Sequence, residues 1–150
     1  MVKRFSLLAA LLVAAPLSAG QVTKKFDWNP SAGAQDIHVE TDRVVVSQLQ
    51  FDMGDRVVAT QFSTAKAVAR VDNNGFLAYE VGVAITIFDG DGNIVAAGSG
   101  GVKLGSLGKG ERDTFTIKFP YVYRNLDKAK TFIVTLETVE KGSKSRSRSD

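Results

Sequence analysis

Apolar and polar side chains alternate with a period of two along most of this chain. The alternation is clearest over residues 79–87, where every second position is apolar, and these positions are Tyr79, Val81, Val83, Ile85 and Ile87. Two later runs, at 114–119 and 131–139, repeat the alternation. A period of two sends successive side chains to opposite faces of a strand. The pattern therefore predicts strands that each bury one face.

Turn signals separate these runs from further β-branched or apolar segments at 43–51, 56–62, 65–71 and 94–104. Clusters of Asp, Asn and Gly mark the turns, and Pro120 ends the strand before it because proline cannot donate to a ladder. Residues 123–130 predict a short helical turn or a loop. Seven or eight strands at spacings of about ten residues predict an all-β fold, an antiparallel β-sandwich.

The first 20 residues have a different pattern. Lys3 and Arg4 precede an uncharged apolar run at 5–15, which Pro16 and then small residues follow. This three-part pattern predicts a secretory signal peptide over residues 1–20, cleaved after Ala19 or Gly20. The run is too short to cross a bilayer, which takes about 20 apolar residues. We therefore expect an exported protein, periplasmic or extracellular, without a transmembrane segment.

Three segments follow the leader. Residues 21–40 predict either an edge strand around 37–39 or a strap that Phe26 and Trp28 hold across the sandwich. Residues 41–140 form the predicted sandwich domain. Residues 141–150 contain no apolar side chain and alternate Ser with basic residues, which predicts a disordered basic tail because nothing in it can be buried.

Composition narrows the function classes. The formal net charge is +3, but without Lys3, Arg4 and the tail the chain keeps 13 of its 19 basic and 15 of its 16 acidic residues. The folded part is thus nearly neutral, which excludes the basic footprint of a nucleic-acid-binding domain. The chain has no cysteine, so no disulfide stabilises it. Small exported animal domains usually carry disulfides, and we therefore favour a bacterial envelope setting.

Residues 65–139 resemble the FxLYD domain of bacterial and archaeal envelope proteins. Ile85-Thr86-Ile87-Phe88-Asp89 matches the motif that names the family, with Ile at its first position, and a D-G turn follows. Leu107, Gly110 and Glu111 match a later step of the pattern. The resemblance covers about half of the chain. It implies an immunoglobulin-like sandwich in an exported protein, and no catalytic residues.

Asp89, Asp91 and Asn93 have the spacing of the first three ligands of a calcium-binding loop. An EF-hand loop also needs Gly at position 6 and Glu at position 12, between two helices. Here Ile94 and Gly100 occupy those positions. Asp-Gly pairs between apolar runs are a strong hairpin signal, so we interpret the stretch as a turn and its residues as weak calcium candidates.

Other candidates for chemistry are isolated. Asp52 and Asp55 could join a calcium site or imitate the carboxylate pair of a glycosidase, but they lie at another predicted turn. His38 is the only histidine, and no cysteine accompanies it as a metal ligand. The glycine-rich stretch 98–110 lacks the spacing of a phosphate-binding loop and predicts a bulge, a wide turn or a close approach of another chain.

Aromatic side chains are the remaining candidates for a binding surface. Trp28, Tyr121 and Tyr123, with Tyr79, could stack on sugars or contact a protein, although we favour core or corner packing for them because aromatic side chains bury large areas. We expect no cofactor and no catalytic activity. The sequence favours an exported β-sandwich module for protein–protein contact, with an envelope protein or a second copy as partner. The alternative is a glycan or cell-wall binding domain, and an enzyme is third.

Overall fold

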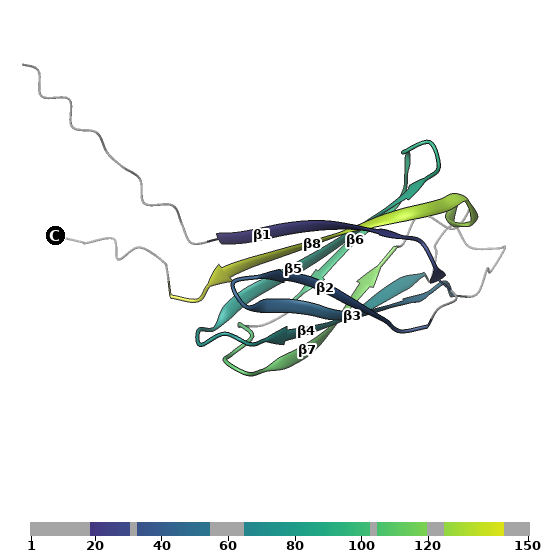
Figure 1. Cartoon of the computed structure of the whole chain (residues 1–150). Coiled ribbons are helices and arrows are strands. Elements are labelled where there is room, and N and C mark those ends of the chain that lie inside the picture. The colour runs from purple at the N-terminus through teal and green to yellow at the C-terminus, as the bar shows by residue number, and fades with distance from the viewer. Residues whose placement is uncertain (1–18, 31–32, 55–64, 103–104, 120–124, 143–150) are drawn as a thin grey trace, which may run out of the picture.

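The predicted strands form two antiparallel sheets of four strands each, packed face to face (Figure 1). The computed structural model describes residues 19–30, 33–54, 65–102, 105–119 and 125–142. Its strands are β1 (Ala19–Asp27), β2 (Gln35–Thr41), β3 (Val44–Asp52), β4 (Lys66–Asn73), β5 (Tyr79–Asp89), β6 (Ile94–Gly101), β7 (Arg112–Lys118) and β8 (Ala129–Glu140). This confirms the all-β sandwich. The predicted strand at 56–62 lies outside the described residues.

Sheet A has the strand order β1-β8-β5-β6, and sheet B has the order β2-β3-β4-β7. A 3₁₀ helix, η2 (Leu126–Lys128), precedes β8 in the segment predicted as a helical turn or a loop. The edges of the sandwich are therefore β1 and β2 on one side and β6 and β7 on the other. No described helix is long and apolar enough to span a bilayer.

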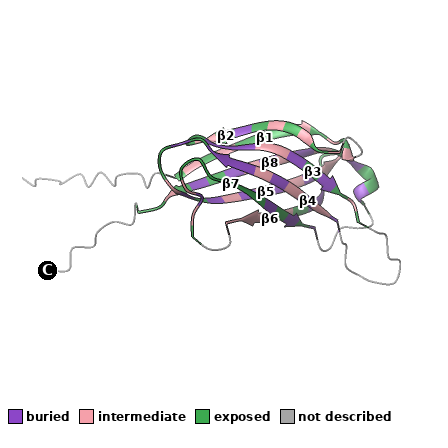
Figure 2. Cartoon of the chain, turned by 90° about the horizontal axis from the view of Figure 1, so that it is seen from below, coloured by how far each residue is buried: buried purple, intermediate pink, exposed green. Residues whose placement is uncertain are grey.

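The core lies between the sheets and consists of the alternating apolar side chains. All five alternate positions of β5, from Tyr79 to Ile87, are buried, whereas Glu80 on the opposite face is exposed. Figure 2 shows buried residues along the strands of both sheets. Antiparallel pairing sets Ile85 opposite Val134 of β8. At one end of the core, four aromatic rings pack together, with centroids 4.5–6.3 Å apart, and they belong to Phe26, Trp28, Phe51 and Phe132.

Residues 21–40 are integral to both sheets. They contribute β1, which pairs with β8 along its whole length, and β2, which pairs with β3. Ala19 and Gly20, which the sequence assigns to the leader, already belong to β1. A side chain at position 20 would collide with Asp42 and would lie 2.7 Å from the Thr138 hydroxyl oxygen, so a larger residue there would require these side chains to move.

A two-residue turn joins β2 to β3. Asp42 and Arg43 have φ angles of 50° and 64°, and positive φ at both central residues is the signature of a type I′ hairpin turn. The Asp42 carboxylate accepts a hydrogen bond of 2.7 Å from the hydroxyl of Thr138, which is buried on β8. This bond ties the turn to sheet A.

Asn73, at the end of β4, is a buried polar residue that holds two loops together. Its side-chain amide donates to the carbonyl oxygens of Leu77, Leu107 and Gly108 at 2.8–3.0 Å. Its side-chain oxygen accepts the N–H of Gly75 at 2.9 Å. A buried amide is tolerated only when its polar atoms are paired, and here the turn after β4 and the segment before β7 supply the partners.

We expect Gly98→Ala to destabilise the fold. A Cβ at this position would lie 3.0 Å from the Ile117 side chain and 3.1 Å from the Phe119 ring, because β6 and β7 approach closely there. Overpacking of this kind costs roughly 1–3 kcal/mol. Gly82→Ala on β5 is the control, since nothing lies within 4 Å of its added Cβ. Urea unfolding measures both, and equal free energies of unfolding for the two variants would contradict the packing.

Candidate functional site

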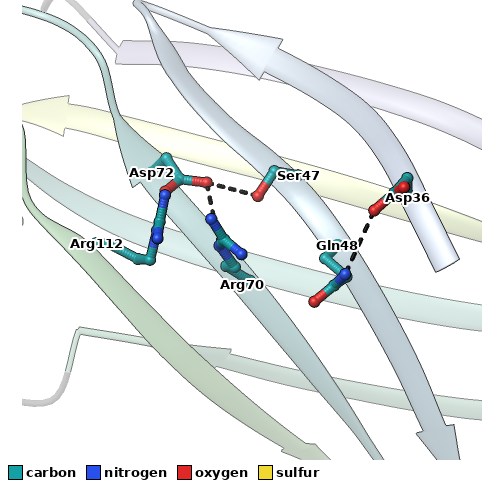
Figure 3. Close-up of polar contacts among 6 residues, drawn as sticks. All are labelled: Asp36, Ser47, Gln48, Arg70, Asp72 and Arg112. Atoms are coloured by element: carbon teal, nitrogen blue, oxygen red, sulfur yellow. Dashed lines mark hydrogen bonds and ion pairs between the residues drawn. The ribbon is translucent and has the colours of Figure 1, made fainter. Parts of the chain in front are cut away.

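A cluster of charged and polar side chains surrounds Asp72, on the outer face of sheet B (Figure 3). Asp72 is on β4, between Ser47 of β3 and Arg112 of β7. The Ser47 hydroxyl donates to one carboxylate oxygen at 2.5 Å, and Arg112 Nε donates to the other. Arg70 Nε lies 3.7 Å from the first oxygen. These contacts join three adjacent strands through one carboxylate.

The environment of Asp72 fixes its charge. Burial of the carboxyl raises its pKa, but the hydrogen bonds from Ser47 and Arg112 and the positive charges of Arg112 and Arg70 outweigh that effect, so the pKa of Asp72 is lowered. A carboxylate held ionised in this way cannot donate a proton near neutral pH. The cluster therefore acts as a cross-strand clamp.

Asp89 begins the turn of the β5–β6 hairpin, and its carboxylate serves that turn. Its Oδ1 accepts the backbone N–H groups of Asp91 and Asn93 at 2.9 and 2.8 Å. The Asn93 side chain donates to Oδ2 at 3.1 Å. These bonds, with the Asn93 side chain as the largest cause, lower the pKa of Asp89. Asp89, Asp91 and Asn93, the three calcium candidates, thus lie together in the turn. Both carboxylate oxygens of Asp89 already accept hydrogen bonds from the other two residues.

Trp28 follows β1 and is half-buried. Its ring packs against Phe51 at a centroid distance of 4.5 Å and against Phe132 at 6.3 Å. Tyr79 is buried in the core. Tyr121 and Tyr123 lie outside the described residues. Part of the aromatic surface considered for sugar stacking therefore packs against the core instead.

The remaining candidates lie apart from one another. His38 is exposed on β2 and pairs with Glu40, with 2.9 Å between Nε2 and the carboxylate oxygen. Asp52 ends β3, accepts the Gly54 N–H and lies 3.4 Å from Lys66 Nζ. Asp55 lies outside the described residues. Among the residues that the structure describes, no group of three His, Cys, Asp or Glu could hold a metal ion.

The four edge strands differ in charge. On one side of the sandwich, β1 carries Lys24 and Lys25, and β2 carries Asp36 and Glu40. Lys24 also reaches across to β2, where its ammonium donates to the His38 carbonyl at 3.1 Å. Charges and inward-directed lysines are the devices by which proteins prevent an edge from pairing with another chain.

On the other side, β7 carries charged residues at both ends, whereas β6 carries none. The sequence of β6, IVAAGSGG, consists only of apolar, small and hydroxyl side chains. It contains no proline to interrupt its backbone donors. Of the four edges, β6 alone lacks every charge-based protection, and Figure 2 shows it at the lower margin of the molecule.

The outer side of β6 presents backbone groups that no other described residue pairs with. The Val102 N–H donates to the Val81 carbonyl at 3.1 Å, which makes this a hydrogen-bonded pair of the β5–β6 register. Alternate residues of an antiparallel strand direct their N–H and C=O groups the other way, and here these are Ala97, Ser99 and Gly101. Within the described part of the chain, these three have no backbone partner beyond the β5 ladder.

A groove of about 550 Å³ lies between the two edges on this side. Residues Ser99 to Val102 of one edge and Asp113 to Thr116 of the other line it. The edges come close at Gly98 and Gly100, where the absence of Cβ atoms permits contact with β7, and they separate toward the groove. The glycines of this stretch therefore allow β6 and β7 of the same chain to approach each other closely. The groove beside this contact is open to a second chain.

The sequence analysis did not predict the Asp72 cluster. It also did not predict that β6 is an edge strand without charged side chains. The first depends on the register of three strands, and the second depends on the sheet order. No family model matches the chain, and no curated protein matches it. The resemblance to the FxLYD domain therefore stays a prediction.

We expect Asp72→Asn to lower the free energy of unfolding by roughly 1.5–3 kcal/mol at neutral pH, the range for hydrogen bonds to charged groups. Because the pKa of Asp72 is lower in the folded than in the unfolded state, its contribution is present above the unfolded pKa of about 3.9 and is lost as the pH falls through the folded pKa. The difference from the wild type should therefore shrink in acid. Asp91→Asn, in the exposed β5–β6 turn, is the control, and a difference that does not change with pH would contradict the clamp.

We expect millimolar calcium to leave the melting temperature unchanged. The turn already uses the Asp89 carboxylate as a hydrogen-bond acceptor, so a cation would have to break these bonds. Thermal melting followed by circular dichroism, with magnesium in place of calcium as the control, measures the effect. A rise with calcium alone would establish a site at the turn.

Proposed function

We propose that this chain is an exported, non-catalytic β-sandwich module that contacts another protein through the β6 edge. The observation that carries the proposal is an edge strand without charge, with outward backbone groups at Ala97, Ser99 and Gly101. In β-augmentation, an extended segment adds to such an edge, and backbone hydrogen bonds supply the affinity. The partner is an envelope protein or a second copy of the chain.

The groove beside β6 supports this mode of binding. Thr114 and Thr116 of β7 line its other wall, and the β4–β7 register directs their backbone N–H and C=O groups away from β4. A strand that enters the groove therefore meets backbone groups of Ser99 and Gly101 on one wall and of Thr114 on the other, whereas the Thr116 carbonyl lies close to Gly100. Small side chains at Ser99 and Gly101 leave the groove open beyond this close approach.

The cellular setting is part of the proposal and rests on the sequence. The three-part pattern of residues 1–20 supports export, and the lack of cysteine suits a bacterial periplasmic or extracellular location. The proposal of a non-catalytic role rests on the positions of the polar groups. Asp72 is held by arginines, Asp89 by its own turn, and His38 by Glu40.

A glycan-binding role has less support than a protein contact. Sugar-binding sites stack aromatic faces on the ligand, but the Trp28 ring packs against Phe51 and Phe132. Tyr79 is buried in the core. We therefore place the protein-contact role first.

The test introduces a proline on the outer side of β6. In Ser99→Pro, the residue loses an N–H that the β5 ladder does not use, so the sandwich keeps its hydrogen bonds. Thr23→Pro is the matched control, because Thr23 also directs its N–H outward, on the charged β1 edge. Tagged chains of both variants and the wild type are crosslinked in the native envelope, and their oligomeric state is measured by light scattering.

We expect wild type and Thr23→Pro to form the same crosslinked complex or dimer, and Ser99→Pro to lose it by at least about tenfold, since edge pairing depends on backbone donors. Circular dichroism checks that both variants stay folded. Retention of the complex by Ser99→Pro would overturn the edge as the contact. A wild-type chain that is strictly monomeric and without crosslinks would overturn the contact role itself.

A further inference from the structure

The outward backbone groups of β6 are arranged symmetrically about one residue. Ala97, Ser99 and Gly101 direct their N–H and C=O groups away from β5, and no other described residue pairs with these groups. Ser99 is the middle one, with an outward residue two positions away on each side. If β6 pairs with an antiparallel copy of itself, the pairing centred on Ser99 therefore uses all three outward residues.

We infer that the chain forms a dimer in which β6 pairs with β6 of a second copy, antiparallel and centred on Ser99. This inference rests on the proposed contact through the β6 edge and names the partner in that contact. In an antiparallel ladder, the two residues of a hydrogen-bonded pair exchange both of their N–H···O bonds. Ser99 would exchange such bonds with Ser99 of the second copy. Ala97 of each copy would do so with Gly101 of the other.

The lack of charge on β6 favours a second copy over a different protein. In a two-fold contact, a side chain at the axis lies opposite the same side chain of the other copy. A charged side chain there would meet a like charge, which destabilises a strand pair. A contact with a different protein has no such restriction, and complementary charges give it specificity and faster association. The sequence of β6, IVAAGSGG, contains no charged residue, as a contact between two copies requires.

The side chains of this edge also fit a second copy. Ala97 and Ser99 are exposed on the outer face of sheet A, and the residues that would lie opposite them are Gly101 and Ser99 of the other copy. No large side chain would therefore separate the two backbones. The Ser99 hydroxyl can donate and accept a hydrogen bond, so the two hydroxyls at the axis can bond to each other, as serine and threonine pairs on adjacent strands do.

The other edge of sheet A limits the assembly to two copies. Pairing through β6 joins the two A sheets into one sheet, in which β1 of each copy forms an outer edge. β1 carries Lys24 and Lys25, and charged residues of this kind prevent an edge from pairing with another chain. A third copy cannot add through β6, because the two β6 strands already pair with each other. The contact is therefore closed.

The first test locates the axis of the dimer with a single thiol. The chain contains no cysteine, so Ser99→Cys introduces its only thiol. The full chain is expressed, and the purified product is treated with a short bismaleimide, which joins two thiols that lie close together. Thr23→Cys is the matched control on the β1 edge. Ala97→Cys tests the register, because the pairing sets the two Ala97 positions four residues apart, roughly 13 Å along the strands, and the crosslinker is chosen to span less than this.

We expect Ser99→Cys to form a crosslinked dimer at least about tenfold faster than Thr23→Cys and Ala97→Cys, since a hydrogen-bonded pair holds its two Cα atoms about 5.5 Å apart. Equal rates for the three variants would indicate random collision and would overturn the inference. A faster reaction of Ala97→Cys than of Ser99→Cys would overturn it as well, because the strands would then pair in another register.

The second test uses charge at the axis. Ser99→Lys and Ser99→Glu each set like charges opposite one another, so each variant alone should self-associate at least about threefold more weakly than the wild type at low salt. An equimolar mixture of the two should recover the association, because opposite charges then meet. Thr23→Lys is the control and should associate as the wild type does. Analytical ultracentrifugation measures the dissociation constants, and a mixture that does not recover would overturn the inference, since a damaged edge behaves in that way.

The failure of this inference is distinguishable from the failure of the proposed function. The purified wild type could stay monomeric while Ser99→Pro abolishes a complex with another protein in the envelope. That result would overturn the second copy as partner and leave the β6 contact in place. A purified chain that is monomeric, and that has no envelope complex sensitive to Ser99→Pro, would overturn both. A purified dimer that Thr23→Pro keeps and Ser99→Pro loses would support both.

Discussion

The pairing of β5 with β8 is the interaction on which the rest of the structure depends. These two strands occupy the centre of sheet A and pair along almost their whole lengths. Their inner faces set Val83, Ile85 and Ile87 opposite Leu136, Val134 and Phe132, and all six side chains are buried. Complete burial of such a side chain stabilises a fold by about 1.5–3 kcal/mol. Every other strand either pairs with these two or packs on the surface they form.

Each of the two sheets has two edge strands, and these edges differ in the charge of their side chains. On the side of β1 and β2, Lys24 bridges the gap between the sheets and charged side chains follow both strands. On the other side, glycines bring β6 against β7 over part of its length, and the groove occupies the rest. Gly98 and Gly100 permit β6 to pack closely against β7 because they lack Cβ atoms. The same glycines leave β6 without side chains that would prevent another chain from pairing with its edge. The packing requirement and the proposed contact thus have one origin.

The sequence predicts the inner faces well because a single local rule, the period of two, governs them. Ile85, Ile117 and Phe132 are buried as that rule requires. The rule fails for β1, whose apolar positions Val22 and Phe26 are interrupted by Lys24. Its identity as a strand comes from pairing with β8, more than 100 positions away in the chain.

The polar features escape prediction for a related reason. Asp72 and Asn73 stand in a stretch that signals a turn, and the turn does follow them. Their partners, however, are Arg112 and the carbonyl groups around Leu107, which only the strand register brings near. Phe76 and Leu77 are exposed and precede β5, although two apolar residues directly before a strand look like its beginning. Whether an apolar residue lies inside a strand or one turn before it depends on where pairing begins.

The pairing of β1 with β8 joins the first described strand to the last. Ala19 lies opposite Val139 and Asp27 lies opposite Thr131, so sheet A has no complete centre until synthesis has reached the end of the chain. Closing a contact over so many residues is slow, and an incomplete chain has neither β8 nor a place for β1. The strands of sheet B all precede β8 in the chain, so that sheet can pair first, and sheet A gains its central strand only when β8 has been made.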